Sequence, residues 1–272
     1  MLDGGAMFGV VPKSIWQKTN PADSNNMVKI AARCLLIEDG DRLTLIDTGM
    51  GNKQSEKFFG YYHRWGEENL ESSIRKCGFS PDDITDVFLT HLHFDHCGGG
   101  VIRIGENSYK TAFKNARYWS NKAHWEWATN PNKREVASFL KENFLPIEES
   151  GQLSFLKRGE KNYLTHCDLG FDVLFVDGHT EKQMIPIINY KGQKLAFAAD
   201  LIPTAGHVPL PYIPGYDIRP LTSLKEKESF LNFCNDNNVL LFFEHDAFEE
   251  LGLVHQTERG IRLKSTLKLL DL

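Results

Sequence analysis

The chain has 272 residues, of which 41% are hydrophobic and 25% charged, a composition typical of a globular protein. Its 31 basic and 36 acidic residues give a formal net charge of −5, and no basic block favours nucleic acid or an anionic membrane as a partner. No apolar run reaches the roughly 18 residues that a membrane span requires. The first residues lack the basic and apolar regions of a signal peptide, so we expect a cytoplasmic protein.

The five cysteines are widely scattered, and no Cys-x-x-Cys pair occurs. An odd number at such spacings argues against a disulfide scaffold and against a structural zinc ribbon, so we expect free thiols. Cys97 directly follows His96 and has the alternative of approaching a metal site there. Neighbouring side chains on a strand or tight loop usually point apart, which favours a thiol that faces away.

Apolar runs in the first half of the chain predict short strands. Two are expected over residues 30–37 and 42–46, and the second ends at Asp47-Thr48-Gly49. An aspartate at such a strand end can orient a neighbouring metal ligand. An amphipathic helix is expected over residues 67–77, and a third, buried strand over residues 86–89.

The densest group of candidate ligands follows this third strand. A His-x-His-x-Asp-His pattern supplies His91, His93, Asp95 and His96, and a glycine triplet then turns the backbone. Three imidazoles and a carboxylate within six residues are costly to cluster unless something binds them. We therefore favour a metal site over a merely structural cluster, and these ligand types suit Zn, Mn, Fe or Co better than Ca or Mg.

A helical segment rich in tryptophan is expected at about residues 119–150, with Ser120 as its cap and a break or kink at Pro131. It contains three of the five tryptophans of the chain: Trp119, Trp125 and Trp127. Aromatic clusters dominate core packing, which favours a helix core here. The alternative is an insertion that roofs an apolar substrate pocket.

The second half of the chain is rich in strands, expected over residues 171–176, 184–190, 194–199 and 239–243. A long proline-rich loop over residues 203–220 precedes Ser223-x-x-Glu226, which matches a capping box that opens a helix to about residue 235. Three of the strands each end in one metal-type side chain: His179, Asp200 and His245. Each alone could be a surface or capping residue, but layered α/β folds collect such strand ends along one edge.

Taken together, these motifs resemble the metallo-β-lactamase superfamily over nearly the whole chain. The resemblance rests on the Asp-Thr-Gly turn at Asp47, the His91–His96 motif, Gly178-His179-Thr180, Asp200 and His245. It implies an α/β fold, a four-layer αββα sandwich of mixed sheets with helices on the outer faces. Residues 1–272 would form a single domain, with the tryptophan-rich segment as an insertion.

The same resemblance implies two divalent metal ions, zinc first, with Mn, Fe or Co as alternatives. His91, His93 and His179 would hold one ion, Asp95, His96 and His245 the other, and Asp200 would bridge them. As a hypothesis, the two ions share a bridging hydroxide that exists at neutral pH and attacks a carbonyl or phosphoryl centre. Asp95 would orient the hydroxide and later pass a proton to the leaving group, and Asp47 would steady a ligand histidine.

Within the superfamily, a bridging aspartate without a cysteine ligand is unlike the true β-lactamases. His93, where diiron redox members carry an acid, favours hydrolysis. RNA-processing members share the ligand set, but this chain is acidic and has no basic arm. The length and the opening Asp3-Gly4-Gly5 with Met7-Phe8-Gly9 look most like the N-acyl-homoserine lactonase and methyl-parathion-hydrolase-like branch. Family likeness also implies a homodimer.

The expected function is therefore the opening of a small-molecule lactone or ester of the N-acyl-homoserine lactone type. The alternative is a phosphotriester hydrolase that uses the same site, and a ribonuclease-type or non-catalytic metal-binding member ranks below both.

The chain departs from the family pattern at two positions. Glu181-Lys182-Gln183 replaces the usual Pro-Gly-His after Gly-His-Thr, and Pro203 stands where several lactonases carry a substrate-contacting tyrosine. His207 is the candidate to replace that tyrosine, with a solvated loop histidine as the alternative. Met7 and Phe8 are expected to line an apolar pocket with the tryptophan-rich segment.

Overall fold

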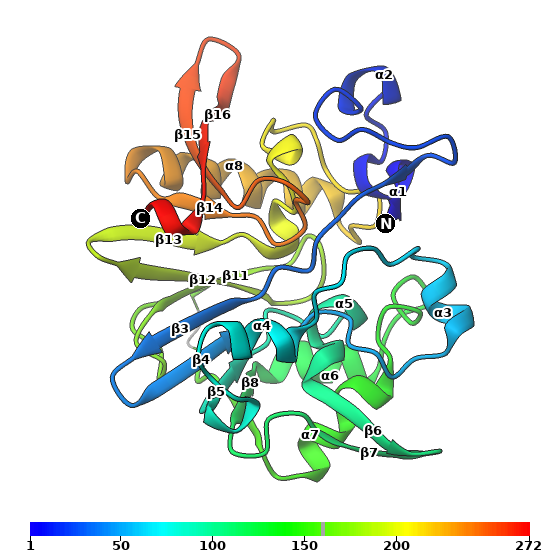
Figure 1. The fold of residues 1–272 in the computed structure, drawn as a ribbon. Helices are drawn as coiled ribbons and strands as arrows, with labels where there is room; N and C mark the ends of the chain where they lie inside the picture. Colours follow the sequence, from blue (N-terminus) through cyan, green and yellow to red (C-terminus); the bar gives the residue numbers. More distant parts are fainter. Residues whose placement is uncertain (159–160) are drawn as a thin grey trace. The chain divides into compact units, whose positions relative to one another are not determined.

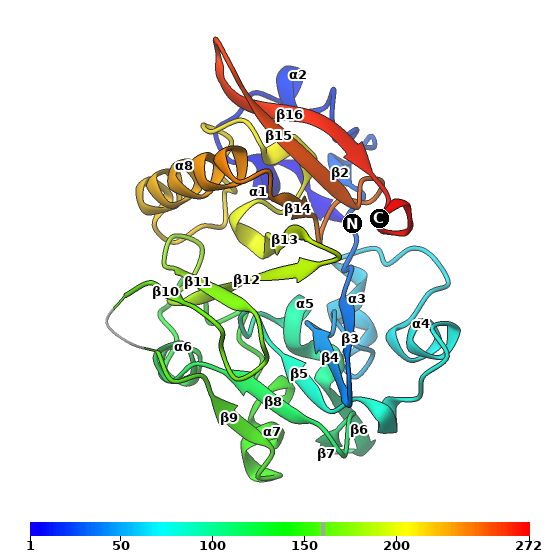
Figure 2. The same ribbon diagram turned by 90° about the vertical axis from the view of Figure 1, so that its left-hand side faces the viewer.

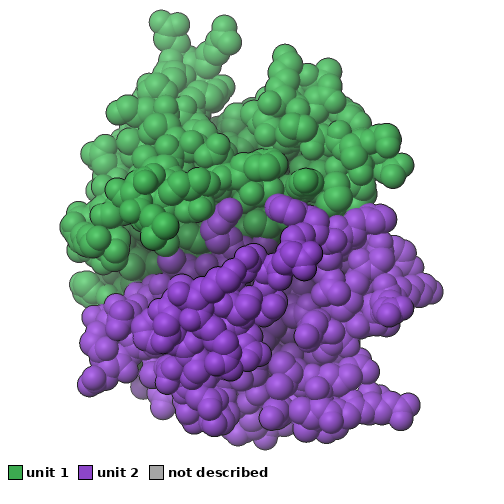
Figure 3. Space-filling model, viewed as in Figure 1, with its two compact units in different colours: residues 1–31, 161–272 green, residues 32–160 purple. Residues whose placement is uncertain are grey.

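The computed structural model describes residues 1–158 and 161–272. The chain divides into two compact units, coloured separately in Figure 3. Unit 1 comprises residues 1–31 and 161–272, and unit 2 comprises residues 32–160. Each unit contains a mixed β-sheet, as expected for an α/β protein. Among the described residues, no helix combines the length and apolar character that crossing a membrane requires.

A five-stranded sheet forms the centre of unit 2 (Figure 2). Its strand order is β3 (Leu35–Asp39), β4 (Arg42–Ile46), β5 (Asp86–Phe88), β8 (Arg117–Ser120) and β9 (Leu153–Phe155). β3 and β4 form an antiparallel hairpin, and the remaining neighbours pair in parallel. The strand predicted over residues 30–37 begins later, because Ile30 and Ala31 pair instead with Asp246 and His245 in unit 1.

Short helices and one hairpin complete unit 2: α3 (Glu56–Gly60), α4 (Leu70–Lys76), α5 (Phe94–Cys97), α6 (Lys122–Thr129), α7 (Leu145–Glu149), β6 (Val101–Gly105) and β7 (Ser108–Thr111). The predicted helix is α4, which starts where the Asn69 side chain caps its first turn. α6 ends before Pro131, as predicted, but its cap is Asn121 and not Ser120. Ser120 instead continues β8, so the cap falls one residue later.

The tryptophan-rich segment contributes to the core of unit 2. Trp125 is buried in a cluster with Phe139 and Phe144. Trp119 is also buried, and its indole Nε1–H donates to Asp86 Oδ1 at 2.7 Å. Trp127 is half-buried and donates to Glu135 Oε2 at 2.8 Å. These contacts agree with the helix-core interpretation of the segment.

A seven-stranded sheet forms the centre of unit 1 (Figure 1). Its order is β10 (Tyr163–Leu164), β11 (Asp172–Val176), β12 (Gln183–Tyr190), β13 (Gln193–Phe197), β14 (Leu240–Phe242), β15 (Leu251–Thr257) and β16 (Gly260–Leu267). β13 and β14 pair in parallel, and the other neighbours are antiparallel. The predicted hairpin between β12 and β13 turns at Lys191 and Gly192, whose φ angles are 50° and 81°.

A long helix, α8 (Pro220–Asp236), contacts β15 and β16 of this sheet. It begins three residues before the predicted capping box, because Pro220 occupies the first helical turn, where its fixed φ is favourable and its missing N–H costs nothing. Ser223 and Glu226 therefore lie inside the helix and do not cap it. The N-terminal part of unit 1 consists of β1 (Leu2–Asp3), α1 (Gly4–Phe8), α2 (Lys13–Trp16) and β2 (Met27–Val28).

Candidate metal centre

In unit 2 the His-x-His-x-Asp-His motif occupies the loop after β5 and the start of α5. His91 and His96 are fully buried, and His93 is 7% exposed. The Asp95 side chain is 25% exposed, and its Oδ1 lies 3.9 Å from His96 Nε2. The motif thus forms a largely buried group of imidazoles with one more accessible carboxylate beside it.

Asp47, at the end of β4, fixes the orientation of two of these histidines. Its Oδ2 accepts from His96 Nδ1–H at 3.0 Å and from the Thr90 hydroxyl at 2.6 Å. Because a carboxylate only accepts, Thr90 Oγ1 retains a lone pair for His91 Nδ1–H at 3.1 Å. Asp47 has a φ of 56°, which an aspartate tolerates better than most residues. Because Nδ1 carries the proton in both His91 and His96, their Nε2 atoms are unprotonated and suited to metal binding.

His91 and His93 bring two nitrogens together. His91 Nε2 lies 3.1 Å from His93 Nδ1, while His93 Nε2 faces Glu135 Oε1 at 3.5 Å. Two nitrogens bound at 2.0–2.1 Å to a tetrahedral zinc are roughly 3.3 Å apart. The spacing of the two imidazoles therefore fits ligands of one metal ion.

The segment around α6 supports the motif in a way that the sequence did not predict. The Leu92 N–H donates to His124 Nε2 at 2.8 Å, and the Phe94 N–H donates to the Ser138 carbonyl at 3.0 Å. The His93 ring also packs against Phe139, with ring centroids 4.7 Å apart. A lone histidine in a helix gives no sequence signal for such a role.

Unit 1 brings together the other three predicted ligands around Asp200. Its two carboxylate oxygens lie 3.1 Å from His179 Nε2 and 3.0 Å from His245 Nε2. All three side chains are buried. Asp200 follows β13 in a 3-10 helix, Ala199–Leu201, whose first residue has an unusual φ of 41°. Strained backbone of this kind is typical of functional sites.

The outer nitrogens of the two unit 1 histidines are also engaged. His179 Nδ1–H donates to Asp217 Oδ1 at 3.0 Å, and His245 Nδ1–H donates to the Ala31 carbonyl at 2.8 Å. Both Nε2 atoms are thus directed to the carboxylate. Metal-bound histidines in proteins characteristically hold the second nitrogen in this way, so the donor set of unit 1 fits a divalent ion as well.

The thiol of Cys97 is not arranged as a metal ligand. It is fully buried and donates to the Leu92 carbonyl at 3.3 Å. Burial raises the pKa of this thiol to about 12, so the protonated form predominates at neutral pH. Its hydrogen bond goes to the backbone carbonyl between His91 and His93 and not to a ligand side chain.

The residues predicted to line the substrate pocket are packed inside unit 1. Phe8 stacks on Trp16 and on His207, with centroids 5.0 and 4.2 Å apart, and Met7 belongs to the same buried cluster. His207 Nε2–H donates to the Met7 carbonyl at 2.9 Å, and its Nδ1 lies 2.7 Å from the Thr204 hydroxyl. This is the environment of a core histidine and differs from the solvated or substrate-facing residue predicted from the sequence.

An aromatic group lies beside Asp95 in unit 2 and was missed by the sequence reasoning. Phe94 packs edge-on against Phe58 and is tilted against Tyr62, with centroid distances of 5.2 and 5.0 Å. Burial, and secondly the Asp95 carboxylate, raise the pKa of Tyr62 to about 12. Its phenol is therefore protonated at neutral pH and stands near the predicted catalytic carboxylate.

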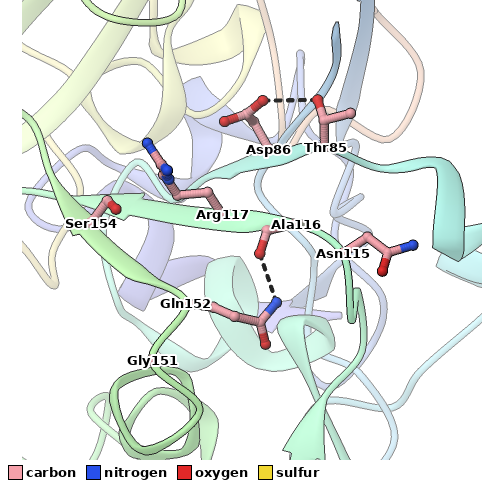
Figure 4. A pocket seen from close by; sticks show the side chains of 8 residues that line it. All are labelled: Thr85, Asp86, Asn115, Ala116, Arg117, Gly151, Gln152 and Ser154. Atoms are coloured by element: carbon pink, nitrogen blue, oxygen red, sulfur yellow. Dashed lines mark hydrogen bonds between the residues drawn. The ribbon is translucent and has the colours of Figure 1, made fainter. Parts of the chain in front are cut away.

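A polar hollow in unit 2 lies at the ends of the strands opposite to the histidine motif (Figure 4). It is lined by residues where β5, β8 and β9 begin, whereas the histidine motif follows the end of β5. Thr85 donates to Asp86 at 2.8 Å and Gln152 donates to the Ala116 carbonyl at 2.6 Å, so these polar side chains are engaged with the protein itself. None of the predicted ligands is among the lining residues.

Comparison with known proteins identifies the same family that the sequence resembles. The family model of the metallo-beta-lactamase superfamily matches residues 30–245. An N-acyl homoserine lactonase from Bacillus cereus is 28% identical over 242 residues, covering 84% of this chain and 86% of its own length.

Two solved structures have a similar fold. A protein described as a probable metal-dependent hydrolase from Staphylococcus aureus has a TM-score of 0.84 and 26% identity, covering 98% of this chain and 92% of its own. AidC, a dizinc quorum-quenching lactonase, has a TM-score of 0.75 and 23% identity, covering 97% and 90% of the two chains.

The match of the family model over most of the chain and the similar fold along its whole length lead to one conclusion. The chain belongs to the metallo-beta-lactamase superfamily and is a hydrolase that resembles N-acyl homoserine lactonases of that superfamily.

Proposed function

We propose that the protein is a dinuclear metal-dependent hydrolase that opens a lactone or ester of the N-acyl-homoserine lactone type. The proposed ligands are the seven predicted residues: His91, His93, Asp95, His96, His179, Asp200 and His245. Zinc is the proposed metal, in line with the dizinc lactonase of similar fold.

The observation that carries this proposal is the position of Asp200. Each of its two carboxylate oxygens faces the Nε2 atom of a different histidine, at 3.1 and 3.0 Å. Both histidines have their other nitrogen engaged, so neither is free to turn away. A carboxylate with one oxygen toward each of two imidazole ligands is suited to bridging two metal ions.

The remaining residues have distinct proposed roles. When bound, two divalent ions would supply activated water at neutral pH and polarise the scissile carbonyl group. Asp95, the one carboxylate of the motif and 25% exposed, would orient the attacking water and donate a proton to the leaving group. Asp47 would keep the Nε2 atoms of His91 and His96 unprotonated through its bonds to Thr90 and His96.

The proposed substrate class rests on the relatives and on the aromatic side chains near Asp95. Several relatives at 24–28% identity over most of the chain are N-acyl homoserine lactonases. Phe58, Tyr62 and Phe94 offer apolar ring faces beside the proposed catalytic carboxylate. Such a surface suits an acyl chain, because removal of apolar area from water is favourable.

The test combines metal analysis with a substrate panel. We expect about two zinc ions per chain, and turnover of N-hexanoyl- and N-decanoyl-homoserine lactone at rates well above those for an aryl ester. An aryl phosphotriester is the third substrate class in the panel. Faster turnover of the phosphotriester would replace the lactone by the alternative substrate class, and metal-loaded protein without turnover of any of the three would contradict the hydrolase proposal.

A further inference from the structure

His179 lies in an irregular turn between two strands and belongs to neither of them. β11 ends at Val176, β12 begins at Gln183, and His179 falls between them in the Asp177–Thr180 turn. A metal ligand on an irregular segment needs other contacts to keep its orientation. In this structure those contacts come from the beginning of α8 and from the residues just before it.

Asp217 holds the His179 ring and is itself held by α8. Its Oδ1 accepts from His179 Nδ1–H at 3.0 Å, and its Oδ2 accepts from the Ser223 hydroxyl at 2.5 Å. Asp217 and Ser223 are each only 3% exposed. The carboxylate is thus fixed at both oxygens, which restricts the imidazole to one orientation.

The backbone of the turn is fixed by the same helix. Glu226 accepts from the Asp177 N–H at 2.8 Å through Oε1 and from the Gly178 N–H at 2.9 Å through Oε2. Arg219 Nη1–H donates to the Asp177 carbonyl at 2.6 Å, and the Arg219 N–H donates to the Gly178 carbonyl at 2.9 Å. Glu226 of α8 and Arg219, the residue before the helix, therefore bond both the N–H and the C=O groups of Asp177 and Gly178.

Gly178 allows this close approach. A Cβ atom at position 178 would lie 2.2 Å from Ser223 Oγ and 2.4 Å from Ser223 N, distances that real Cβ atoms do not adopt. Any other residue would push the turn away from α8 and would separate Asp217 from His179. The contact between the turn and α8 therefore requires glycine at position 178, the first residue of Gly-His-Thr.

We propose that Asp217 is a positioning residue for the metal ligand His179, and that Ser223 and Glu226 of α8 hold Asp217 and the turn for this purpose. This inference rests on the proposed metal centre. A carboxylate on Nδ1–H selects the tautomer with an unprotonated Nε2 and makes that nitrogen a stronger ligand. The sequence pattern Ser223-x-x-Glu226 therefore serves the metal site and does not cap the helix.

The experiment measures zinc affinity of the full-length protein by competition with a chromophoric chelator, and the absorption spectrum of the cobalt-substituted protein. We expect Asp217→Ala to weaken zinc binding about 10- to 100-fold, the range measured for lost partners of metal-bound histidines. Asp217→Asn keeps an acceptor but loses the charge, and should fall between Asp217→Ala and wild type. Both variants should alter the cobalt d–d bands, which a purely structural role would leave unchanged.

Ser223→Ala and Glu226→Gln are milder variants that keep Asp217 and test the support from α8. We expect each to weaken zinc binding several-fold, and they provide the test if Asp217→Ala does not fold. Glu228→Gln, an exposed position on the same helix, is the matched control and should bind like wild type.

Folded Asp217 variants with wild-type zinc affinity and cobalt spectrum would overturn the inference while leaving the metal centre intact. Wild-type protein that binds neither zinc nor cobalt would instead overturn the proposed function, and with it the role assigned to Asp217.

Discussion

His124 Nε2 accepts the backbone N–H of Leu92 at 2.8 Å, and this bond connects helix α6 to the residue between two proposed metal ligands. The His124 side chain is completely buried. Since Nε2 acts as the acceptor, its proton must lie on Nδ1. The bond satisfies a buried amide that neither β5 nor α5 can satisfy, because Leu92 lies between them.

Replacing His124 should show how much this hydrogen bond contributes to the free energy of unfolding. His124→Leu leaves the Leu92 amide unsatisfied and should cost about 1–3 kcal/mol of unfolding free energy, whereas His124→Gln retains an acceptor and should cost less. Urea denaturation of metal-free protein measures the difference. Equal losses in the two variants would show that packing of the ring, and not the hydrogen bond, stabilises the loop.

The site residues that could be identified from the sequence share one property: each is a metal-type side chain at a place where such a residue is uncommon. Three imidazoles in six residues, and single His or Asp residues directly after apolar strands, are recognisable without a structure. The strands themselves were predictable because alternating and apolar runs reflect burial. β4, β5 and the hairpin of β12 and β13 lie close to the predicted ranges.

The supporting residues were not predictable, because their roles depend on contacts between distant parts of the chain. His124 is 32 residues from Leu92, and Asp217 is 38 residues from His179. Nothing local marks either of them. Ser223 and Glu226 did give a local signal, but Pro220 starts the helix earlier. The Ser223 side chain bonds Asp217, and the Glu226 side chain bonds the turn that precedes His179.

Removal of metal should destabilise the protein. The buried Asp200 carboxylate and the two imidazoles 3.0–3.1 Å from it lose the ion that is proposed to hold them together. Because a ligand that binds only the folded state stabilises it by mass action, zinc at 100 times its Kd should restore about 2.7 kcal/mol. Thermal denaturation with and without chelator, followed by zinc titration, provides the measurement. A melting temperature that does not respond to chelator or to zinc would contradict the prediction.

Asp95→Asn should separate metal binding from proton transfer. The amide retains an oxygen that can serve as a ligand but cannot carry the proton, so we expect kcat to fall about 10²- to 10⁴-fold with most of the bound metal retained. Single-turnover kinetics together with metal analysis on the same sample make the comparison. Asp41→Asn, at an exposed turn of unit 2, is the control. Unchanged turnover in Asp95→Asn at full metal content would remove Asp95 from its proposed role.

His207 should make the protein sensitive to acid. Burial lowers the pKa of this imidazole from 6.5 to about 3, so the native state keeps it neutral. As the pH falls from 6.5 towards 3, the unfolded chain binds a proton that the native state does not. The unfolding free energy should therefore decrease by up to about 1.4 kcal/mol per pH unit from this group, with no further contribution below pH 3 or above pH 6.5.

Urea denaturation across this pH range isolates the contribution when wild type is compared with His207→Gln. The variant is expected to be less stable at neutral pH, because it loses the stacking on Phe8, but to have a shallower pH dependence. His255→Gln, at an exposed position on β15, is the matched control and should leave the slope of wild type intact. If the His207→Gln curve runs parallel to that of wild type down to pH 3, the acid sensitivity comes from other groups and the neutral core role of His207 is contradicted.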